Sequence, residues 1–506
     1  MNRKELIGIV IMSLLTTWLM EYFLFNRKPV STEVKSGQSF VAPERPLNVE
    51  VDFMDERRAQ HPVKTEIETA HANMLFSSLG ASLERLEFKR EHNGKDDILT
   101  TVFPVNATER EKRCFLVALN QNTPYFYDLV SHKDFSDTVE LVYSADATDA
   151  RITKTFVVHK ATDKIDLTVR VEPKADKAVE LRIWYPTPIL SALLTTDIKA
   201  GVTTDERGSV VKVLRSKIEP NKWWFKPAVF GTEDRYFVFA MIADTAQFVQ
   251  RAYYRLAGHN ELYAALEGPT VTQDRSWTLS FYMGPKEASR MAAVDPRLES
   301  TLEYAGWRAP ISKVLLLMLI ALYKWLGNYG LAIIVLTIGI RLVLLPFSLR
   351  GEKTMKERAE YQKKLQYVQQ RYSQDPERLA QERKELMEKH GVSGVSGCLP
   401  LLVQIPIFFA LSSVLSSAIQ LYQAPFLWIP DLSASDPYYV LPCLIFFAML
   451  WQAMIADEKS RTSTLIMALI FGAFSTSFAA GLSLYIFLST VLAVLQATIY
   501  KMVKAA

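Results

Sequence analysis

A single basic residue, Arg341, lies inside an apolar stretch, AIIVLTIGIRLVLLPF (residues 332 to 347), that contains no other charged side chain. A charge at mid-membrane depth costs upward of about 2.5 kcal/mol, so such residues usually mark a functional site and have a partner. Apart from Glu21, the apolar segments long enough to cross a bilayer contain no Asp or Glu. Arg341 therefore has no carboxylate to pair with inside the predicted membrane core, which distinguishes it from most structural charges in membranes.

Other polar residues lie at a similar depth in the predicted membrane helices. At a rise of 1.5 Å per residue, Arg341 is about 10 Å from the predicted cytoplasmic end of its helix. Three further helices carry polar side chains in the same half of the bilayer: Gln404, Gln452, Ser489, Thr490 and Gln496. Because polar groups in lipid need partners or water, this pattern predicts a hydrophilic cavity open to the cytoplasm. It is equally compatible with an arginine that extends toward inner-leaflet phosphates and with glutamines that mark helix ends.

Motifs for catalysis or cofactor binding are missing from the sequence. The seven histidines form no HExxH or similar metal-ligand pattern, and no GxxxxGK[ST] loop for a nucleotide is present. Of the three cysteines, only Cys114 lies in the polar half, so no disulfide can form within it, and we expect this thiol to be a buried small apolar side chain. A net charge of +4 over 506 residues does not indicate a nucleic-acid partner. The sequence thus predicts a protein that is not an enzyme and that has no cofactor or metal.

The elements that position Arg341 are membrane helices in the C-terminal half. A bilayer-spanning helix needs about 20 apolar residues. Five segments of residues 311 to 500 are close to that length, namely 329–348, 399–418, 438–455, 463–478 and 482–500. Residues 1–25 form a further apolar segment after basic residues and are predicted to be an uncleaved signal anchor. The run from Val314 to Leu326 is shorter and flanked by lysines, so we expect it to lie along the interface as an amphipathic helix.

The distribution of Lys and Arg predicts the topology. Residues 350–390 contain eleven Lys or Arg, whereas residues 419–437 contain none. Because short cytoplasmic loops are enriched in basic residues, we expect six crossing helices, a cytoplasmic N-terminus and an exported domain before residue 296.

The polar half has the pattern of a β protein. In IDLTVRVEP, Ile165, Leu167, Val169 and Val171 alternate with polar residues, as in a half-buried strand. More than ten such runs predict a large exported β-sandwich over residues 61–295, after a flexible linker at 26–60 rich in Pro and Ser. Residues 296–327 connect this domain to the membrane core of residues 328–500, and a short tail follows at 501–506.

A helical hairpin is predicted at residues 350–396, between two membrane helices. Apolar side chains recur at helical spacing in its first arm, at Tyr361, Leu365, Val368 and Tyr372. Asp375 followed by Pro376 is a typical helix start, and Gly391 a typical helix end. We expect an antiparallel pair of helices that projects into the cytoplasm.

Several long motifs resemble the YidC/Oxa/Alb family of membrane protein insertases, and their order is similar to that of its Gram-negative members. They are GNYGLAIIVLTIGIRLVLLP (327 to 346), GCLPLLVQIPIFFAL (397 to 411), QAPFLWIPDLSASDPYYVLP (423 to 442) and GLSLY (481 to 485), with FSSLGAS (76 to 82) and YMGPK (282 to 286) in the polar half. The resemblance implies a β-supersandwich, a five-helix insertase core and a cytoplasm-facing groove in the bacterial inner membrane. Arg341 matches the family's groove arginine, and Thr337 and Tyr485 match positions near the substrate path.

The resemblance also implies partners: nascent membrane proteins, membrane lipids, the SecYEG translocon, and the ribosome or signal-recognition machinery. Only KMVKAA follows Tyr500, so direct ribosome docking through a long basic tail is not expected. Where the family often has Pro-Ser-Gly, this chain has Ala479, Ala480 and Gly481, and we expect a less rigid turn there.

A second hypothesis is a small-molecule anion transporter with an exported sensing domain, in which Arg341 binds the solute. Such transporters place their site between repeated halves, and the sequence shows no internal repeat. A third hypothesis, an enzymatic β domain, lacks a His and carboxylate cluster.

Overall fold

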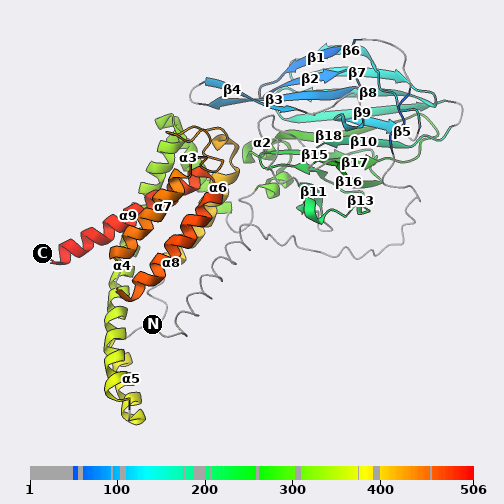
Figure 1. Ribbon diagram of the computed structural model, residues 1–506. Helices are drawn as coiled ribbons and strands as arrows, with labels where there is room; N and C mark the ends of the chain where they lie inside the picture. Colours follow the sequence, from blue (N-terminus) through cyan, green and yellow to red (C-terminus); the bar gives the residue numbers. More distant parts are fainter. Residues whose placement is uncertain are drawn as a thin grey trace. The chain divides into compact units, whose positions relative to one another are not determined.

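The chain forms two compact units, which divide between Ala305 and Gly306 (Figure 1). The computed structural model describes residues 50–54, 61–92, 95–102, 110–119, 121–174, 177–186, 200–205, 208–219, 221–257, 261–302, 309–373, 375–390, 399–455 and 458–505. The predicted signal anchor at 1–25 lies outside these residues, as does most of the linker at 26–60.

The first unit is a β domain of eighteen strands in its described part. They are β1 (Lys64–Glu68), β2 (Ala72–Ser77), β3 (Ser82–His92), β4 (Lys95–Val102), β5 (Leu116–Leu119), β6 (Asp128–Asp134), β7 (Thr138–Asp146), β8 (Ala150–His159), β9 (Lys164–Pro173), β10 (Leu181–Pro186), β11 (Ala200–Thr204), β12 (Val210–Leu214), β13 (Trp223–Phe225), β14 (Phe230–Glu233), β15 (Phe237–Asp244), β16 (Arg251–Ala257), β17 (Glu261–Glu267) and β18 (Arg275–Pro285). Short 3₁₀ helices, η1 (Arg110–Lys112) and η2 (Arg215–Lys217), interrupt them.

The strands form three antiparallel sheets in two layers. A nine-stranded sheet, β12-β11-β14-β15-β18-β9-β8-β7-β6, makes one layer, and the sheets β1-β2-β3-β4 and β13-β16-β17-β10-β5 face it. Ring contacts join the layers: Phe76 lies 5.0 Å from Phe156, and Tyr185 lies 5.4 Å from Phe281, between ring centroids. The predicted β-sandwich is confirmed in this form.

The alternation read from the sequence corresponds to burial in the sandwich. On β9, Ile165, Leu167, Val169 and Val171 are each 0% exposed. Cys114 is also 0% exposed, as predicted for a small apolar side chain. Burial raises the pKa of the Cys114 thiol, so the reactive thiolate is disfavoured.

A buried lysine, Lys154 on β8, ties the two layers together. Its ammonium Nζ donates to the carbonyl oxygens of Gly80, Ala81 and Phe115, at 2.8, 2.5 and 2.6 Å. All three carbonyls belong to residues with positive φ, so Lys154 holds two tight turns in place. Burial lowers the pKa of the Lys154 amine, but three acceptors require the three N–H donors of the charged form.

The β domain ends in α2 (Ala288–Val294) and the 3₁₀ helix η3 (Pro296–Thr301), which are joined to the rest of the domain by an ion pair and a hydrogen bond. Arg290 donates from Nε and Nη2 to both carboxylate oxygens of Asp163, at 2.7 and 2.5 Å. Ser300 Oγ donates to the carbonyl oxygen of Val210, at the start of β12 (2.9 Å).

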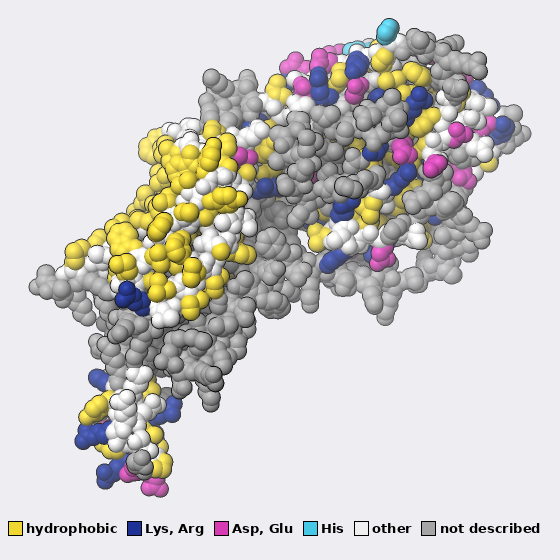
Figure 2. Space-filling model, in the orientation of Figure 1, with side chains coloured by type: hydrophobic (Ala, Val, Ile, Leu, Met, Phe, Trp, Pro, Cys, Tyr) yellow, Lys and Arg dark blue, Asp and Glu magenta, His cyan; other side chains and the backbone are white. Residues whose placement is uncertain are grey.

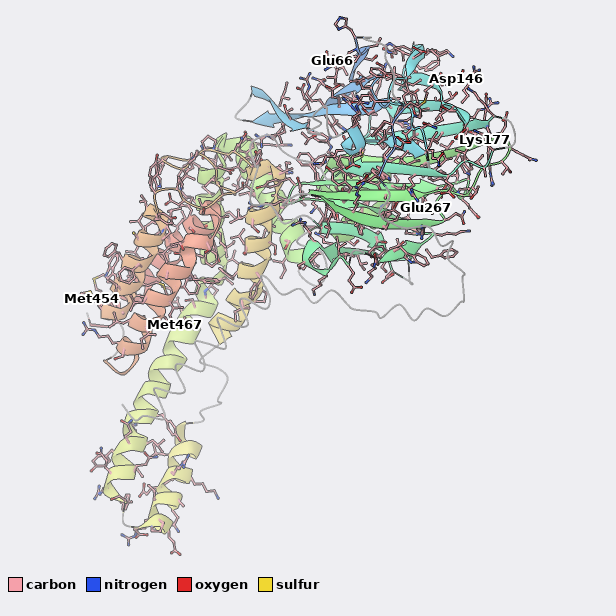
Figure 3. The ribbon with its side chains drawn as sticks, turned by 45° about the vertical axis from the view of Figure 1, so that its right-hand side comes forward. Glu66, Asp146, Lys177, Glu267, Met454 and Met467 are labelled. Atoms are coloured by element: carbon pink, nitrogen blue, oxygen red, sulfur yellow. The ribbon has the colours of Figure 1, made fainter. Side chains whose placement is uncertain are left out.

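The second unit is helical. Its elements are α3 (Ala309–Leu326), α4 (Tyr329–Arg371), α5 (Pro376–His390), α6 (Leu399–Ser417), α7 (Val440–Ile455), α8 (Glu458–Phe474) and α9 (Ala480–Ala505), with the 3₁₀ turns η6 (Ile419–Leu421) and η7 (Ser475–Ser477). Figure 2 shows that hydrophobic side chains cover most of the visible bundle surface, whereas charged ones gather on the hairpin. The exposed apolar residues of α7 include Phe447, Trp451 and Met454, the last of which is labelled in Figure 3.

The helix boundaries differ from the sequence prediction in two places. The membrane helix predicted to end at residue 348 continues through Pro346 to Arg371, so it forms one 43-residue helix with the first hairpin arm. The residues after Ser348 include several good helix formers and no further proline, which explains the continuity. The run from Val314 to Leu326 is part of an 18-residue helix that begins at Ala309. The helix is thus longer than the apolar run itself, and its placement along the interface stays a prediction.

By length and composition, three helices of the described residues could cross a membrane: Ala309–Leu326, Tyr329–Pro346 and Ala480–Ile499. Ile405–Ser417, Val440–Ile455 and Thr464–Ser477 are shorter apolar helices. The predicted six crossings therefore stay a prediction.

We predict that Lys154→Met destabilises the β domain by about 2–4 kcal/mol, because it leaves three buried carbonyls without their donor, each worth roughly 1–3 kcal/mol before the ammonium's own burial cost is subtracted. Pulse proteolysis of the purified full chain in urea measures this. Lys133→Met, at a lysine side chain that is 60% exposed, is the control and should change little. Equal stability of the Lys154→Met protein would show that the carbonyls do not need the ammonium.

Candidate functional site

The candidate site lies between α4 and α9, which pack in parallel with a constant register. Arg341 contacts Ser489, and Ser348 contacts Gln496, so both pairs are 148 positions apart. The same offset joins Ile333 and Gly481, where a Cβ on the glycine would lie 3.2 Å from Ile333 Cδ1. The three contacts thus follow one seam along the two helices.

Arg341 is held by one neutral hydroxyl. Its Nε and Nη2 both donate to Ser489 Oγ, at 2.9 and 2.5 Å. A guanidinium has five N–H donors, and within the described residues no other hydrogen bond or ion pair of Arg341 is recorded. The side chain is half-buried, and its helix neighbours Leu342 and Val343 are 63% and 72% exposed. Arg341 is therefore anchored, but most of its hydrogen-bonding capacity is uncommitted.

A second polar contact lies seven residues further along both helices. Gln496 Nε2 donates to Ser348 Oγ at 2.8 Å. Seven residues correspond to about two helical turns, or roughly 10 Å. Ser348 is not among the residues that the sequence singled out, because nothing in a sequence reveals the offset between two helices.

The structure brings together only part of the predicted set. Thr337 and Tyr485 are 1% and 2% exposed and share the 148-residue offset, so both belong to the seam. Thr490 Oγ1 donates to the carbonyl oxygen of Ile486 on its own helix (2.8 Å). Gln452, on α7, is exposed, and no contact with Arg341 is found in the described part of the chain. The side chain of Gln404 lies outside the described residues.

The segment between α6 and α7 covers one end of the α4–α9 seam. Phe426 packs on Gly330 of α4, where an added Cβ would lie 2.1 Å from the phenyl ring. At the start of α9, the N–H groups of Ala480 and Gly481 donate to the carbonyl oxygens of Ala434 and Leu432, at 2.6 and 2.8 Å. These bonds hold the turn for which the sequence suggested less rigidity.

A carboxylate orders the same segment before α7 begins. Asp436, 3% exposed, accepts from the N–H groups of Tyr438 and Leu441 at 3.1 and 2.7 Å. Trp428 Nε1 also lies 3.5 Å from it. The bundle therefore has a hydrogen-bonded cap at the end opposite to Ser348, and a polar seam toward the other end.

Comparisons with known proteins define the class of this chain. Residues 64–318 match the family described as "YidC periplasmic domain", and residues 321–505 match the family described as "60Kd inner membrane protein". The chain belongs to the YidC family of membrane protein insertases.

Three relatives named "Membrane protein insertase YidC" are 25–30% identical to this chain over the aligned residues. That of Methylobacillus flagellatus is 29% identical over 87% of this chain and 84% of its own length. That of Nitrosospira multiformis is 30% identical over 74% and 68%. That of Campylobacter jejuni is 25% identical over 98% and 95%. The anion-transporter hypothesis finds no support among them, and the relatives are insertases rather than enzymes.

We predict that Ser489→Ala lowers the stability of the helical unit by about 1.5–3 kcal/mol, the usual worth of a hydrogen bond to a charged group. The loss should vanish in an Arg341→Ala background, because the same interaction has already been removed. Unfolding of the detergent-solubilised full chain, compared across this double-mutant cycle, tests the coupling. Thr490→Val is the matched control, since its hydroxyl bonds only to its own helix. Additive losses in the double variant would mean that Ser489 does not support Arg341.

Proposed function

We propose that this protein inserts newly made proteins into the bacterial inner membrane and helps them to fold, alone or with the Sec translocon. The proposed path is a hydrophilic groove, open to the cytoplasm and to lipid, with Arg341 in its wall. The observation that carries this proposal is that Ser489 is the one hydrogen-bond partner of Arg341 among the residues that the structure describes. The remaining N–H donors of Arg341 suit the carboxylates, amides and carbonyls of a polypeptide.

The main barrier to insertion is the desolvation of polar parts of the substrate. Moving the polar tail of a substrate across a bilayer costs mainly the loss of its hydration. A positive group inside the inner leaflet lowers that cost for acidic and polar segments over part of the distance. Burial of the substrate's apolar segment in lipid, at about 25 cal/mol per Å², then drives the reaction without a nucleotide.

The cap over the opposite end supports a groove with one aqueous opening. The bonds from Ala480 and Gly481, and the packing of Phe426 on Gly330, close that end with backbone and ring contacts. We infer that the cap lies at the periplasmic side, that Ser348 and Gln496 lie at the cytoplasmic mouth, and that apolar segments of the substrate leave sideways into lipid. In this arrangement six helices cross, the N-terminus is cytoplasmic and the β domain of residues 61–295 is periplasmic.

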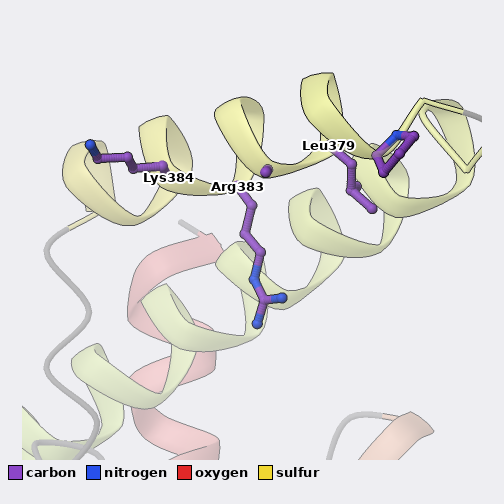
Figure 4. Close-up of a pocket in the computed structure, with 5 residues that line it drawn as sticks. Leu379, Arg383 and Lys384 are labelled. Atoms are coloured by element: carbon purple, nitrogen blue, oxygen red, sulfur yellow. The ribbon is translucent and has the colours of Figure 1, made fainter.

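The hairpin of α4 and α5 is the proposed cytoplasmic docking region for the ribosome or signal-recognition machinery. An open hollow of about 320 Å³ is lined by Pro376, Leu379, Ala380, Arg383 and Lys384. Figure 4 shows Arg383 extending from α5 toward α4. Apolar and basic side chains together suit a partner segment with acidic and apolar residues.

We predict that Arg341→Ala abolishes insertion of a single-span substrate with an acidic exported tail into liposomes that contain only this protein. Arg341→Lys should retain much of the activity, because the charge remains although the planar donor array is lost. A substrate with an uncharged tail is the control and should be affected much less. Equal loss for both substrates would rule out the electrostatic role of Arg341.

The topology predicts opposite labelling of two exposed positions in a variant that also carries Cys398→Ser and Cys443→Ser. A cysteine at Pro430 should react with an impermeant thiol reagent added from the periplasmic side, whereas one at Gln381, on α5, should react only after the membrane is opened. Labelling of permeabilised cells is the control for intrinsic reactivity. Reaction at position 381 from the periplasmic side would contradict the proposed orientation.

A further inference from the structure

One edge of the β domain combines exposed basic residues with aromatic ones. We call it the β13 patch and define it as η2, β13 and their flanking residues, at 215–219 and 221–226. Its basic residues are Arg215, Lys217, Lys222 and Lys226, and its one acidic residue is Glu219. β13 is the terminal strand of its five-stranded sheet and pairs on one side only, with β16. It lies at the margin of the domain in Figure 1.

The aromatic residues of the patch are fixed by the sheet. Trp224 points into the sandwich, with its ring 5.6 Å from Phe230 and 5.1 Å from Tyr254, between centroids. Trp223 packs on the opposite face of the sheet against a buried cluster that includes Tyr253. Phe225, which follows, is 49% exposed. The strand thus presents an apolar ring to solvent from a rigid support.

The lysines of the patch lack acidic partners, unlike other surface lysines of the domain. Lys64, Lys89 and Lys177 each lie within 3 Å of a carboxylate oxygen, at 2.9, 2.6 and 2.5 Å. Lys217, Lys222 and Lys226 are exposed and form no ion pair with the residues that the structure describes. Lys222 and Lys226 lie instead over the rings of Trp224 and Phe225, at 5.6 and 5.5 Å from the centroids. Unpaired cations beside aromatic rings suit an anionic, partly apolar surface.

A short covalent connection joins the β domain to the membrane helices. η3 bonds to Val210 at the start of β12, and β12 leads directly into η2. Only six residues, 303–308, separate Leu302 from α3, and they span at most about 25 Å even when extended. A membrane surface is therefore always present at the other end of this connection, whereas a soluble partner would have to be recruited.

We propose that the β13 patch binds the anionic phospholipid headgroups of the membrane in which the helices lie, with Phe225 at the level of the headgroups. The lysines supply the electrostatic attraction, and the ring adds interfacial affinity. This docking rests on the exported position of the β domain in the proposed function. It would hold the domain beside the membrane without using any residue of the Arg341 site.

The test uses the full chain with Cys398→Ser and Cys443→Ser, reconstituted in nanodiscs. A fluorophore on a cysteine at Asn221 reports the distance to headgroups that carry a spin-label quencher. Nanodiscs of phosphatidylcholine alone are compared with nanodiscs that also contain phosphatidylglycerol. We expect strong quenching only with the anionic lipid, and its loss at high salt, because screening weakens surface attraction.

Charge reversal at the patch provides the decisive comparison. The Lys217→Glu, Lys222→Glu, Lys226→Glu variant should lose the anionic-lipid quenching by about tenfold or more, and the corresponding Gln variant by less. A matched variant with Lys133→Glu, Arg151→Glu and Lys177→Glu changes the net charge equally on exposed residues outside the patch and should keep the quenching. Pulse proteolysis checks that all variants are folded.

Quenching that is equal in neutral lipid, or that survives the patch reversal, would overturn the proposal. Absence of quenching in both lipids would overturn it too, and would leave a protein partner for this surface. Liposome insertion, measured on the same samples, separates this result from the proposed function. A failure of Arg341-dependent insertion with intact quenching would count against the groove and not against the patch.

Discussion

The arrangement of the membrane unit depends on the single register between α4 and α9. Both polar contacts, Arg341 with Ser489 and Ser348 with Gln496, require the same 148-residue offset. The offset is set at the capped end, where Gly481 allows α9 to approach Ile333 closely. A slip of one turn would separate both pairs together and leave a guanidinium without its acceptor at a depth where it costs several kcal/mol. The glycine contact and the capping hydrogen bonds therefore control a charge that lies two turns away.

Arg341 differs from the buried basic groups of the β domain in how its hydrogen bonds are satisfied. Lys154 donates to three carbonyl oxygens, Lys286 lies 3.1 Å from the buried carboxylate of Glu233, and Arg251 lies 3.0 Å from that of Glu267, which Figure 3 labels in the β domain. These groups are compensated by carbonyl oxygens or by an opposite charge, as stable buried cations are. In the described part of the helical unit, Arg341 has one neutral hydroxyl as its hydrogen-bond partner. Within the described residues, these buried cations of the β domain are fully compensated, whereas Arg341 in the helical unit has a single hydroxyl partner, which is the pattern expected of a binding group.

The sequence predicted the elements well and their contacts poorly, for a physical reason. The alternation of apolar and polar residues in β9 is a local property, and it corresponded to one buried face of the strand. The apolar runs of α4 and α9 are local too, and they corresponded to helices. The spacing of the polar residues along each helix was also readable, because the rise along a helix is a linear function of position. The side of a helix on which a side chain lies cannot be read in this way. Gln452 was therefore grouped with Arg341, although the structure shows no contact between them in its described part. Ser348 was missed because only the packing of two helices far apart in sequence makes it a partner. The end of the helix predicted at 329–348 was placed where the apolar run stops, although the polar residues that follow continue the same helix to Arg371.

The position of Arg341 along α4 bears on how much of the barrier a groove could remove. Tyr329 begins the helix, and Arg341 is twelve residues further on, or about 18 Å. A polar segment held at Arg341 would have roughly that distance left to cross, compared with about 30 Å for the whole hydrocarbon core. Binding must nevertheless be weak enough for release, since a site that binds a passing group too tightly stops transport. One arginine supported by a hydroxyl meets both demands: it attracts a carboxylate from the aqueous side, and it offers no second cation to retain it. Further basic residues in the seam would bind the polar segment more tightly, but they would not shorten the distance between Arg341 and the far side of the membrane.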